Sequence, residues 1–327
     1  MKSIFTWCGS FLWSTASIVN HAFEKKGEDL GCRVVSVGNI QAGGAGKTPL
    51  VAALARAVIS NGDVPVILTR GYLGTRELTC GVLPPSRLGE YESLDPDEWG
   101  DEPVLLKSLV PDAWIGVGAK RAHVFRSLLL PRLASELQLP VEQTLRRVVV
   151  ILDDGFQHRK VRRSVDVVAL TSTSRSERLF REFSSALKRA DVLVWTKGEQ
   201  CPVAEGDSRL VIARFRVPTP DARFSKKQWW FVSGIGEPTS ALKAIQEAGW
   251  KVAKSVVFRD HARYQPALIQ SIRSDAEQAG CGVLISGKDA VKWQALGAQP
   301  GDDLQVVEPI VEFSRGSELW SQILLSK

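Results

Sequence analysis

The sequence predicts an α/β protein built on a parallel β-sheet, and three observations support this fold class. Short apolar runs rich in Val and Ile alternate along the chain with stretches of helix-forming residues. A glycine-rich turn at 42–46 comes soon after the first apolar run. A longer apolar run at 148–152 ends in two aspartates. Alternation of strands and helices is typical of doubly wound parallel sheets.

The elements of a first, larger domain follow from composition. A helix is expected at 48–62, because Pro49 is tolerated in a first turn and Gly62 is a typical stop. The other apolar, β-branched runs read as buried strands and the longer mixed runs as helices. Strands are predicted at 33–39, 64–71, 113–118, 146–155, 164–171 and 190–197, and further helices at 102–110 and 180–190.

The composition changes near residue 220, which predicts a second domain. Residues 215–227 contain prolines and lysines and read as a linker or an arm. The alternation then restarts, with strands expected at 229–236, 252–258 and 282–287, and helices at 239–249, 266–280 and 288–296. We therefore divide the chain into an N-terminal segment, 1–30, a phosphate-loop domain, 31–222, and a smaller α/β domain, 223–327.

Composition and charge narrow the classes of protein to which the chain can belong. A hydrophobic content of 44% and a charged content of 24% are ordinary for a soluble globular chain of 327 residues. A net charge of +6 is too small to indicate nucleic-acid binding by itself. The 5 cysteines lack metal-ligand spacing, which predicts free thiols in a reducing compartment. No motif indicates an obligate protein partner.

The N-terminal segment is mostly apolar between Lys2 and the charged run at 24–26. It is short for a membrane-spanning helix, which needs about 20 apolar residues. Three interpretations remain open. The segment is an interfacial or membrane-dipping helix anchored by Trp7 and Trp13, a helix packed on the protein's own core, or a signal peptide.

The glycine-rich turn is interpreted as a phosphate-binding loop. It lies between a predicted strand and a predicted helix, which is the context that such a loop requires. The usual pattern begins with glycine, where this chain has Gln41. Small residues still let backbone N–H groups surround an anion, Lys47 is placed to neutralise phosphates, and Thr48 to bind Mg²⁺. The nucleotide-binding residues are therefore predicted to be Gly43, Gly44, Ala45, Gly46, Lys47 and Thr48.

Carboxylates supply the remaining candidates for chemistry. Asp153 and Asp154 end a hydrophobic strand, and two adjacent carboxylates are naturally compensated by a cation such as Mg²⁺. Asp101 and Glu102 precede a predicted helix, where a simple dipole interaction is the alternative reading. His158 follows the aspartate pair and is either catalytic or structural.

Taken together, the motifs resemble one family. "VGNIQAGGAGKTPLV", "LTRGY", "GDEPVLL", "VGAKRA", "ILDDGFQH", "SALKRAD", "GIGEP", "FRDH" and "GKDAVKW" occur in this order. As a set they resemble the tetraacyldisaccharide 4'-kinase family of lipid A biosynthesis, over residues 33–295. The chain departs from the family pattern at Ala262, where a second histidine is common, and in a divergent segment at 171–185.

The resemblance implies an ATP- and Mg²⁺-dependent kinase. Such an enzyme phosphorylates the 4'-hydroxyl of an acylated glucosamine disaccharide 1-phosphate on the cytoplasmic face of the bacterial inner membrane. It implies that Asp101 and His261 activate the hydroxyl. By the same resemblance, the metal site would be formed by Thr48, Glu102, Asp153 and Asp154, and the substrate side by Arg70, Tyr72, Arg121, Gln157 and His158.

Two rival functions are weighed against this one. A membrane-associated phosphate-loop NTPase would act as a switch without a lipid acceptor. Membrane partitioning ATPases of that kind carry a lysine where this chain has Ala42, which argues against them. Nucleic-acid binding is suggested only by the basic run at 158–163, and aromatic residues do not interleave with it as single-strand binding requires.

Overall fold

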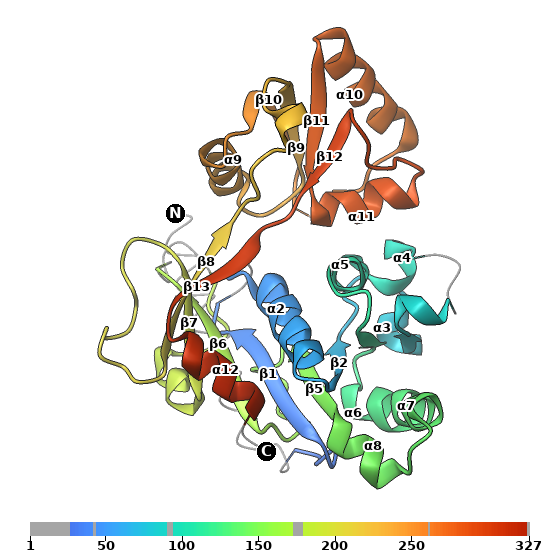
Figure 1. The fold of residues 1–327 in the computed structure, drawn as a ribbon, viewed down its shortest axis with the longest axis vertical. Coiled ribbons are helices and arrows are strands. Elements are labelled where there is room, and N and C mark those ends of the chain that lie inside the picture. Colours follow the sequence, from blue (N-terminus) through green and yellow to red (C-terminus); the bar gives the residue numbers. More distant parts are fainter. Residues whose placement is uncertain (1–26, 42–43, 90–93, 173–178, 261, 326–327) are drawn as a thin grey trace.

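The structure is a computed structural model that describes residues 27–41, 44–89, 94–172, 179–260 and 262–325. Figure 1 shows a larger lobe and a smaller lobe, each built on its own β-sheet. The larger sheet has 9 strands in the order β13-β8-β7-β6-β1-β5-β2-β4-β3, and the smaller has 4 in the order β10-β9-β11-β12. The α/β class predicted from the sequence is confirmed.

The larger sheet is parallel through its centre and antiparallel at both edges, where β3 pairs with β4 and β13 with β8. The sheet is therefore mixed, which the alternating pattern did not predict. Its strands are β1 (Arg33–Asn39), β2 (Val64–Thr69), β3 (Gly81–Leu83), β4 (Trp114–Val117), β5 (Val148–Asp153), β6 (Val165–Thr171), β7 (Val192–Lys197), β8 (Leu210–Arg216) and β13 (Ile310–Arg315).

Helices cover both faces of this sheet, since alternate residues of its central strands enter two separate cores. Val35 of β1 packs in one core with α2 and α5, whereas Val34 packs in the other with the helical stretch 124–133. The helical segments of this lobe are α2 (Lys47–Ser60), α3 (Arg76–Thr79), η1 (Ser86–Leu88), α4 (Pro96–Trp99), α5 (Asp101–Leu109), α6 (Arg121–His123), the π-helical η2 (Val124–Leu129), α7 (Leu130–Leu137), α8 (Val141–Arg147), η3 (Ser184–Arg189) and α12 (Ser317–Leu325). The short η4 (Ala222–Phe224) packs through Phe224 in the core of the smaller lobe.

The smaller sheet is entirely parallel. Its strands are β9 (Gln228–Ser233), β10 (Lys251–Val257), β11 (Cys281–Ser286) and β12 (Leu304–Val307), and its helices are α9 (Pro238–Glu247), α10 (Pro266–Gln278) and α11 (Gly287–Ala295). Helix α11 faces the larger lobe and contacts α5 and α4 (Figure 1). This contact brings the smaller lobe over the edge where the central strands end.

The chain passes between the lobes twice, once after β8 and once before β13. Because β13 pairs with β8, and α12 packs on α2, residues 310–325 belong with the larger sheet. The smaller lobe therefore ends near residue 308. The domain predicted from the sequence extended from 223 to 327, so this second boundary was not predicted. The smaller lobe consists of a segment inserted between two strands of the larger sheet.

The predicted helix at 180–190 is corrected to the short 3₁₀-helix η3, with an irregular segment before it. The backbone N–H of Arg181 donates to the Ile40 carbonyl at 2.8 Å, which holds the chain against the phosphate loop instead of in a helical turn. A backbone N–H used in this way is no longer available for an intrahelical bond.

The predicted N-terminal membrane-associating helix, 1–30, lies outside the described residues except for 27–30. There the backbone N–H of Glu28 donates to the Lys160 carbonyl, and Leu30 is buried in the core. None of the described helices combines the length and the apolar character that crossing a membrane requires.

Candidate functional site

The phosphate loop connects β1 to α2, as predicted. Its described part includes two residues in the left-handed region, Gly44 at φ 67° and Gly46 at φ 72°. Gly43, also a predicted nucleotide ligand, lies outside the described residues. A Cβ on Gly46 would lie 2.2 Å from the ring of Phe215 in β8. Glycine is therefore required here both by the backbone conformation and by the space.

Lys47 begins α2 and points toward the end of β5. Its ammonium lies 3.3 Å from the Asn39 side-chain oxygen and 3.4 Å from Oδ1 of Asp154. On its other oxygen, Asp154 accepts a hydrogen bond of 2.6 Å from Arg181. Burial raises the pKa of Asp154, but Lys47 and Arg181 outweigh burial and hold that pKa at about 2. Asp154 is therefore an anion at neutral pH.

Asp153 lies beside Asp154 but in different surroundings. Its carboxylate is buried and accepts a hydrogen bond of 3.0 Å from the hydroxyl of Thr69. Burial, followed by the negative charges of Glu102 and Asp154, raises the pKa of Asp153 to about 7. Three carboxylates therefore converge where β5 ends and α5 begins, and their mutual repulsion favours a cation between them.

The predicted metal ligands are Thr48, Glu102, Asp153 and Asp154. Within the described ranges, no group of three or more His, Cys, Asp or Glu side chains is arranged as a metal site. One observation fits a cation nevertheless: Oδ1 of Asp154 is buried and accepts no hydrogen bond from the part of the chain that the structure describes, and its described partner is the Lys47 ammonium at 3.4 Å. Carboxylate and hydroxyl oxygens, here with Thr48 buried at the start of α2, are the ligand types that Mg²⁺ takes.

Asp101 lies at the first position of α5, where the two lobes meet. Its carboxylate forms an ion pair of 2.9 Å with Lys292 of α11, with both side chains largely buried. The same Lys292 ammonium donates to the Ala262 carbonyl at 3.1 Å. His261, the predicted partner of Asp101, lies outside the described residues. Its neighbour Ala262 is thus held next to Asp101 by an ammonium group.

The predicted substrate residues fall into an exposed and a buried group. Tyr72 is 55% exposed, and the Arg70 guanidinium is exposed as well while pairing with Glu77 at 2.5 Å. Arg121, by contrast, is only 6% exposed and donates to the Asp153 carbonyl at 3.0 Å. Arg121 therefore holds the backbone between Asp153 and Asp154 from the interior of the lobe.

Gln157 and His158 follow the two aspartates in the chain, and both are partly buried. The Gln157 amide donates to the Asn39 carbonyl at 2.8 Å and to Glu182 at 3.1 Å. Burial, and then the positive charges of Arg121, Lys160 and Arg163, lowers the pKa of His158 to about 3. A neutral imidazole of such low basicity is unsuited to take a proton from an alcohol at neutral pH.

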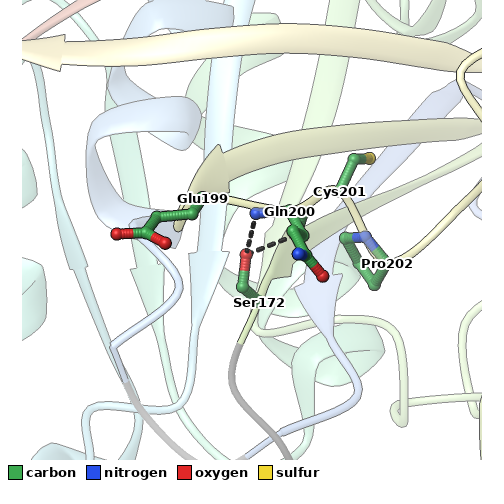
Figure 2. A pocket seen from close by; sticks show the side chains of 5 residues that line it. All are labelled: Ser172, Glu199, Gln200, Cys201 and Pro202. Atoms are coloured by element: carbon green, nitrogen blue, oxygen red, sulfur yellow. Dashed lines mark hydrogen bonds between the residues drawn. The ribbon is translucent and has the colours of Figure 1, made fainter.

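A surface hollow lies after the ends of β6 and β7. It has a volume of about 440 Å³ and is lined by Ser172, Glu199, Gln200, Cys201 and Pro202. Figure 2 shows the Ser172 hydroxyl hydrogen-bonded to the backbone of Gln200, which closes the turn around the hollow. None of the predicted site residues lines it.

Sequence reasoning missed three residues that the structure brings into the site. Arg181 pairs with Asp154, Asn39 contacts Lys47, and Lys292 pairs with Asp101. Arg181 lies in the segment that diverges from the family pattern, and Lys292 lies in the motif "GKDAVKW". Neither position carries a local signal of chemistry, because each acquires its partner only through long-range folding.

Comparisons with known proteins find relatives in sequence and in fold. Similar proteins include the tetraacyldisaccharide 4'-kinases of Anaeromyxobacter sp. (strain K), 30% identical over 88% of this chain and 80% of the relative, and of Syntrophus aciditrophicus (strain SB), 31% identical over 80% and 76%. The fold is similar to the crystal structure of LpxK from Aquifex aeolicus, an "apo" form in complex with ATP, with a TM-score of 0.73, 24% identity and 99% of both chains covered. The family model described as Tetraacyldisaccharide-1-P 4'-kinase matches residues 3–326. The chain belongs to the tetraacyldisaccharide-1-phosphate 4'-kinase family.

Proposed function

We propose that the protein transfers the γ-phosphoryl group of ATP to the 4'-hydroxyl of an acylated glucosamine disaccharide 1-phosphate, the lipid A precursor. One observation carries the proposal within this family. Lys47, at the start of the phosphate-loop helix, pairs with Asp154 at the end of β5, and Glu102, which follows Asp101 at the start of α5, lies close enough to Asp153 to raise its pKa. This arrangement suits phosphoryl transfer, which needs charge neutralisation on one side and an oriented alcohol on the other.

Nucleotide binding falls to the phosphate loop. Backbone N–H groups at the N-terminus of α2 would hold the phosphates, as anion sites at helix N-termini do. Lys47, which lies 3.4 Å from Asp154, would contact the β- and γ-phosphates. Since Arg181 also pairs with Asp154, that carboxylate would keep a cationic partner when Lys47 contacts the phosphates.

Mg²⁺ is the metal that fits the oxygen donors of Asp153, Asp154, Glu102 and Thr48. When bound, it supplies positive charge to the phosphate oxygens during transfer. Its charge would also favour the ionised form of Asp153, whose pKa is raised to about 7 by burial and by neighbouring carboxylates. Thr69 and Arg121 hold that aspartate in place from behind.

Asp101 and His261 are proposed to orient and deprotonate the acceptor hydroxyl. A carboxylate beside a histidine raises the basicity of the imidazole and fixes its orientation. The 2.9 Å pair between Asp101 and Lys292 brings the segment that carries residue 261 to α5, which supports this assignment. The basicity of His158 is too low for the same role, since its pKa is about 3.

The acceptor is proposed to approach over Arg70 and Tyr72, which are the exposed members of the predicted substrate set. Arg121, Gln157 and His158 support the site from the interior. We further propose that residues 1–30 associate with the cytoplasmic face of the bacterial inner membrane, where the lipid acceptor resides. The net charge of +6 favours an anionic surface of this kind.

The test is transfer of labelled γ-phosphate from ATP to tetraacyldisaccharide 1-phosphate in detergent micelles, with Mg²⁺ and with EDTA. The expected result is lipid labelling that requires Mg²⁺. ATP hydrolysis without lipid labelling would instead support the rival function, an NTPase switch that has no lipid acceptor. Binding to liposomes of anionic and neutral composition, with and without residues 1–30, tests the membrane proposal separately.

A further inference from the structure

We propose that Lys292 is a positioning residue of the phosphoryl-transfer site, which holds the Asp101 carboxylate against the loop that follows β10. The inference rests on the proposed function and adds to it a residue whose role follows from the joint between the lobes. Lys292 belongs to the smaller lobe and Asp101 to the larger one. The pair is therefore formed only when the lobes are apposed.

The Lys292 ammonium has two described partners on opposite sides. It lies 2.9 Å from Oδ2 of Asp101 and donates to the Ala262 carbonyl at 3.1 Å. The Lys292 side chain is 13% exposed and that of Asp101 16% exposed, so water screens the pair only weakly. One ammonium therefore fixes both the α5 carboxylate and the backbone of the β10–α10 loop.

The packing of α11 determines where Lys292 points. The residue before it, Val291, belongs to the core of the larger lobe, whereas Trp293 is fully buried in the core of the smaller lobe. Helix α11 is thus held by both cores at the turn that carries Lys292. Because both cores hold α11, the Lys292 ammonium keeps its position relative to Asp101 as long as the lobes stay together. A positioning residue needs a fixed place of this kind.

The loop that Lys292 contacts is anchored at a second point. The Tyr264 hydroxyl donates to Asp289 of α11 at 2.7 Å, and the Tyr264 ring packs edge-on against Trp293 at 5.7 Å. Ala262 lies between this anchor and residue 261. The Lys292 contact therefore fixes the middle of the loop at Ala262, while the Tyr264–Asp289 contact fixes the part that leads into α10.

A lysine in this place has a chemical consequence for the proposed mechanism. Asp101 can orient a base only if its carboxylate remains in one position, and the ammonium defines that position on the side of α11. Effective catalysis depends on such alignment to within a fraction of an ångström. Lys292 is consequently expected to affect turnover through Asp101, and not through affinity for ATP.

The experiment is a double-mutant cycle that compares the wild type, Lys292→Met, Asp101→Asn and the double variant. Each is assayed for kcat and for KM of ATP and of the lipid acceptor. The expected result is that Lys292→Met lowers kcat about tenfold or more and changes KM for ATP less than about twofold. The double variant should be no slower than Asp101→Asn alone by more than about twofold, since coupled residues are not additive.

Controls separate positioning from loss of folding. Glu237→Gln removes another ion pair between the lobes, which Glu237 forms with Lys197 at 2.9 Å, without touching Asp101. It should lower the melting temperature slightly and leave kcat within about twofold of the wild type, as expected for a pair that is about one-third exposed. Lys292→Arg, which keeps the charge and donors, should recover part of the lost kcat, and Lys292→Gln, which removes the charge, replaces Lys292→Met in the cycle if the latter does not fold.

Two outcomes would overturn the inference. One is multiplicative loss in the double variant, because Lys292 would then act on the substrate directly. The other is a Lys292→Met variant that is as fast as the wild type. Wild-type lipid labelling is the internal reference: its absence would contradict the proposed function, whereas normal wild-type labelling with either outcome contradicts only the role of Lys292.

Discussion

The end of the larger sheet and the joint between the lobes place charged groups in different ways. At the end of the sheet, Lys47, Asp153 and Asp154 come from elements that share one core, and each has more than one described partner. At the joint, Asp101 and Lys292 come from different lobes. The first arrangement persists as long as the larger lobe is folded, whereas the second depends on how the lobes meet.

The difference indicates a division of labour. Nucleotide binding is assigned to the rigid part, where local geometry is fixed by neighbouring strands. Activation of the acceptor is assigned to the part that forms only where the two lobes meet, so it depends on how the lobes are apposed. Variants at the two places should therefore separate binding of ATP from turnover.

The largest effect is expected for Lys47→Ala. It removes the charge that faces the phosphates, and loss of one such group costs about 10²- to 10³-fold in rate. Both ATP affinity and kcat/KM should fall, as measured by calorimetry and by the lipid-labelling assay. Lys243→Ala, on the exposed face of α9, is the matched control and should change neither. Unchanged ATP affinity would contradict the assignment of nucleotide binding to this end of the sheet.

Asp101→Asn is expected to lower kcat by about 10²-fold, the usual scale for general acid–base groups. ATP affinity should stay nearly intact, since Asp101 lies on the joint side. Asp97→Asn is the control, because Asp97 lies four residues earlier and its side chain, 82% exposed, reaches the smaller lobe only through a solvent-exposed 4.0 Å ion pair with Arg263. An equal loss of ATP affinity and turnover in Asp101→Asn would remove the distinction between the two regions.

Gly46→Ala tests how tightly the phosphate loop is packed. The added Cβ would lie 2.2 Å from the Phe215 ring, at a residue with φ 72°. Overpacking combined with left-handed strain should cost about 2 kcal/mol or more of unfolding free energy, measured in urea. Gly62→Ala separates the two contributions, because Gly62 has φ 82° and nothing within 4 Å of its added Cβ. If both variants lose the same unfolding free energy, the Phe215 ring moves aside at no cost, and the phosphate loop is not tightly packed against it.

The smallest effect at neutral pH concerns His158. Its pKa is lowered to about 3, so the folded state resists protonation that the unfolded chain accepts near pH 6.5. The contribution is fully present above pH 6.5 and is lost as the pH falls toward 3, since the unfolded state then binds the extra proton. NMR should show one imidazole that does not titrate between pH 5 and 8, and His158→Gln should remove its signals. If that imidazole titrates near pH 6.5, the His158 side chain is open to water, which would contradict the prediction.

Sequence patterns located most of the strands because burial leaves a local signature, but fewer than half of the α-helices: the helical stretch from α6 to α8 and the C-terminal α12 were not predicted. The apolar run before Asp153 predicted β5, and the turn before Lys47 predicted the start of α2. Four strands, β3, β8, β12 and β13, were not predicted. β3 and β12 have only 3 and 4 residues, and β8 and β13 are only partly buried, so none of them has a long apolar run. The segment at 180–190 looked helical, but the contact of Arg181 with the phosphate loop prevails over its local preference.

The sequence by itself determined the α/β class, the phosphate loop and the carboxylates that end β5, because each depends on residues adjacent in the chain. Only the tertiary structure decided the return of β13 to the larger sheet, the pairing of Arg181 with Asp154 and the pairing of Lys292 with Asp101. Lys292 is separated from Asp101 by more than half of the chain. No local pattern specifies a partner at that distance, because the contact exists only once both cores have formed around α11.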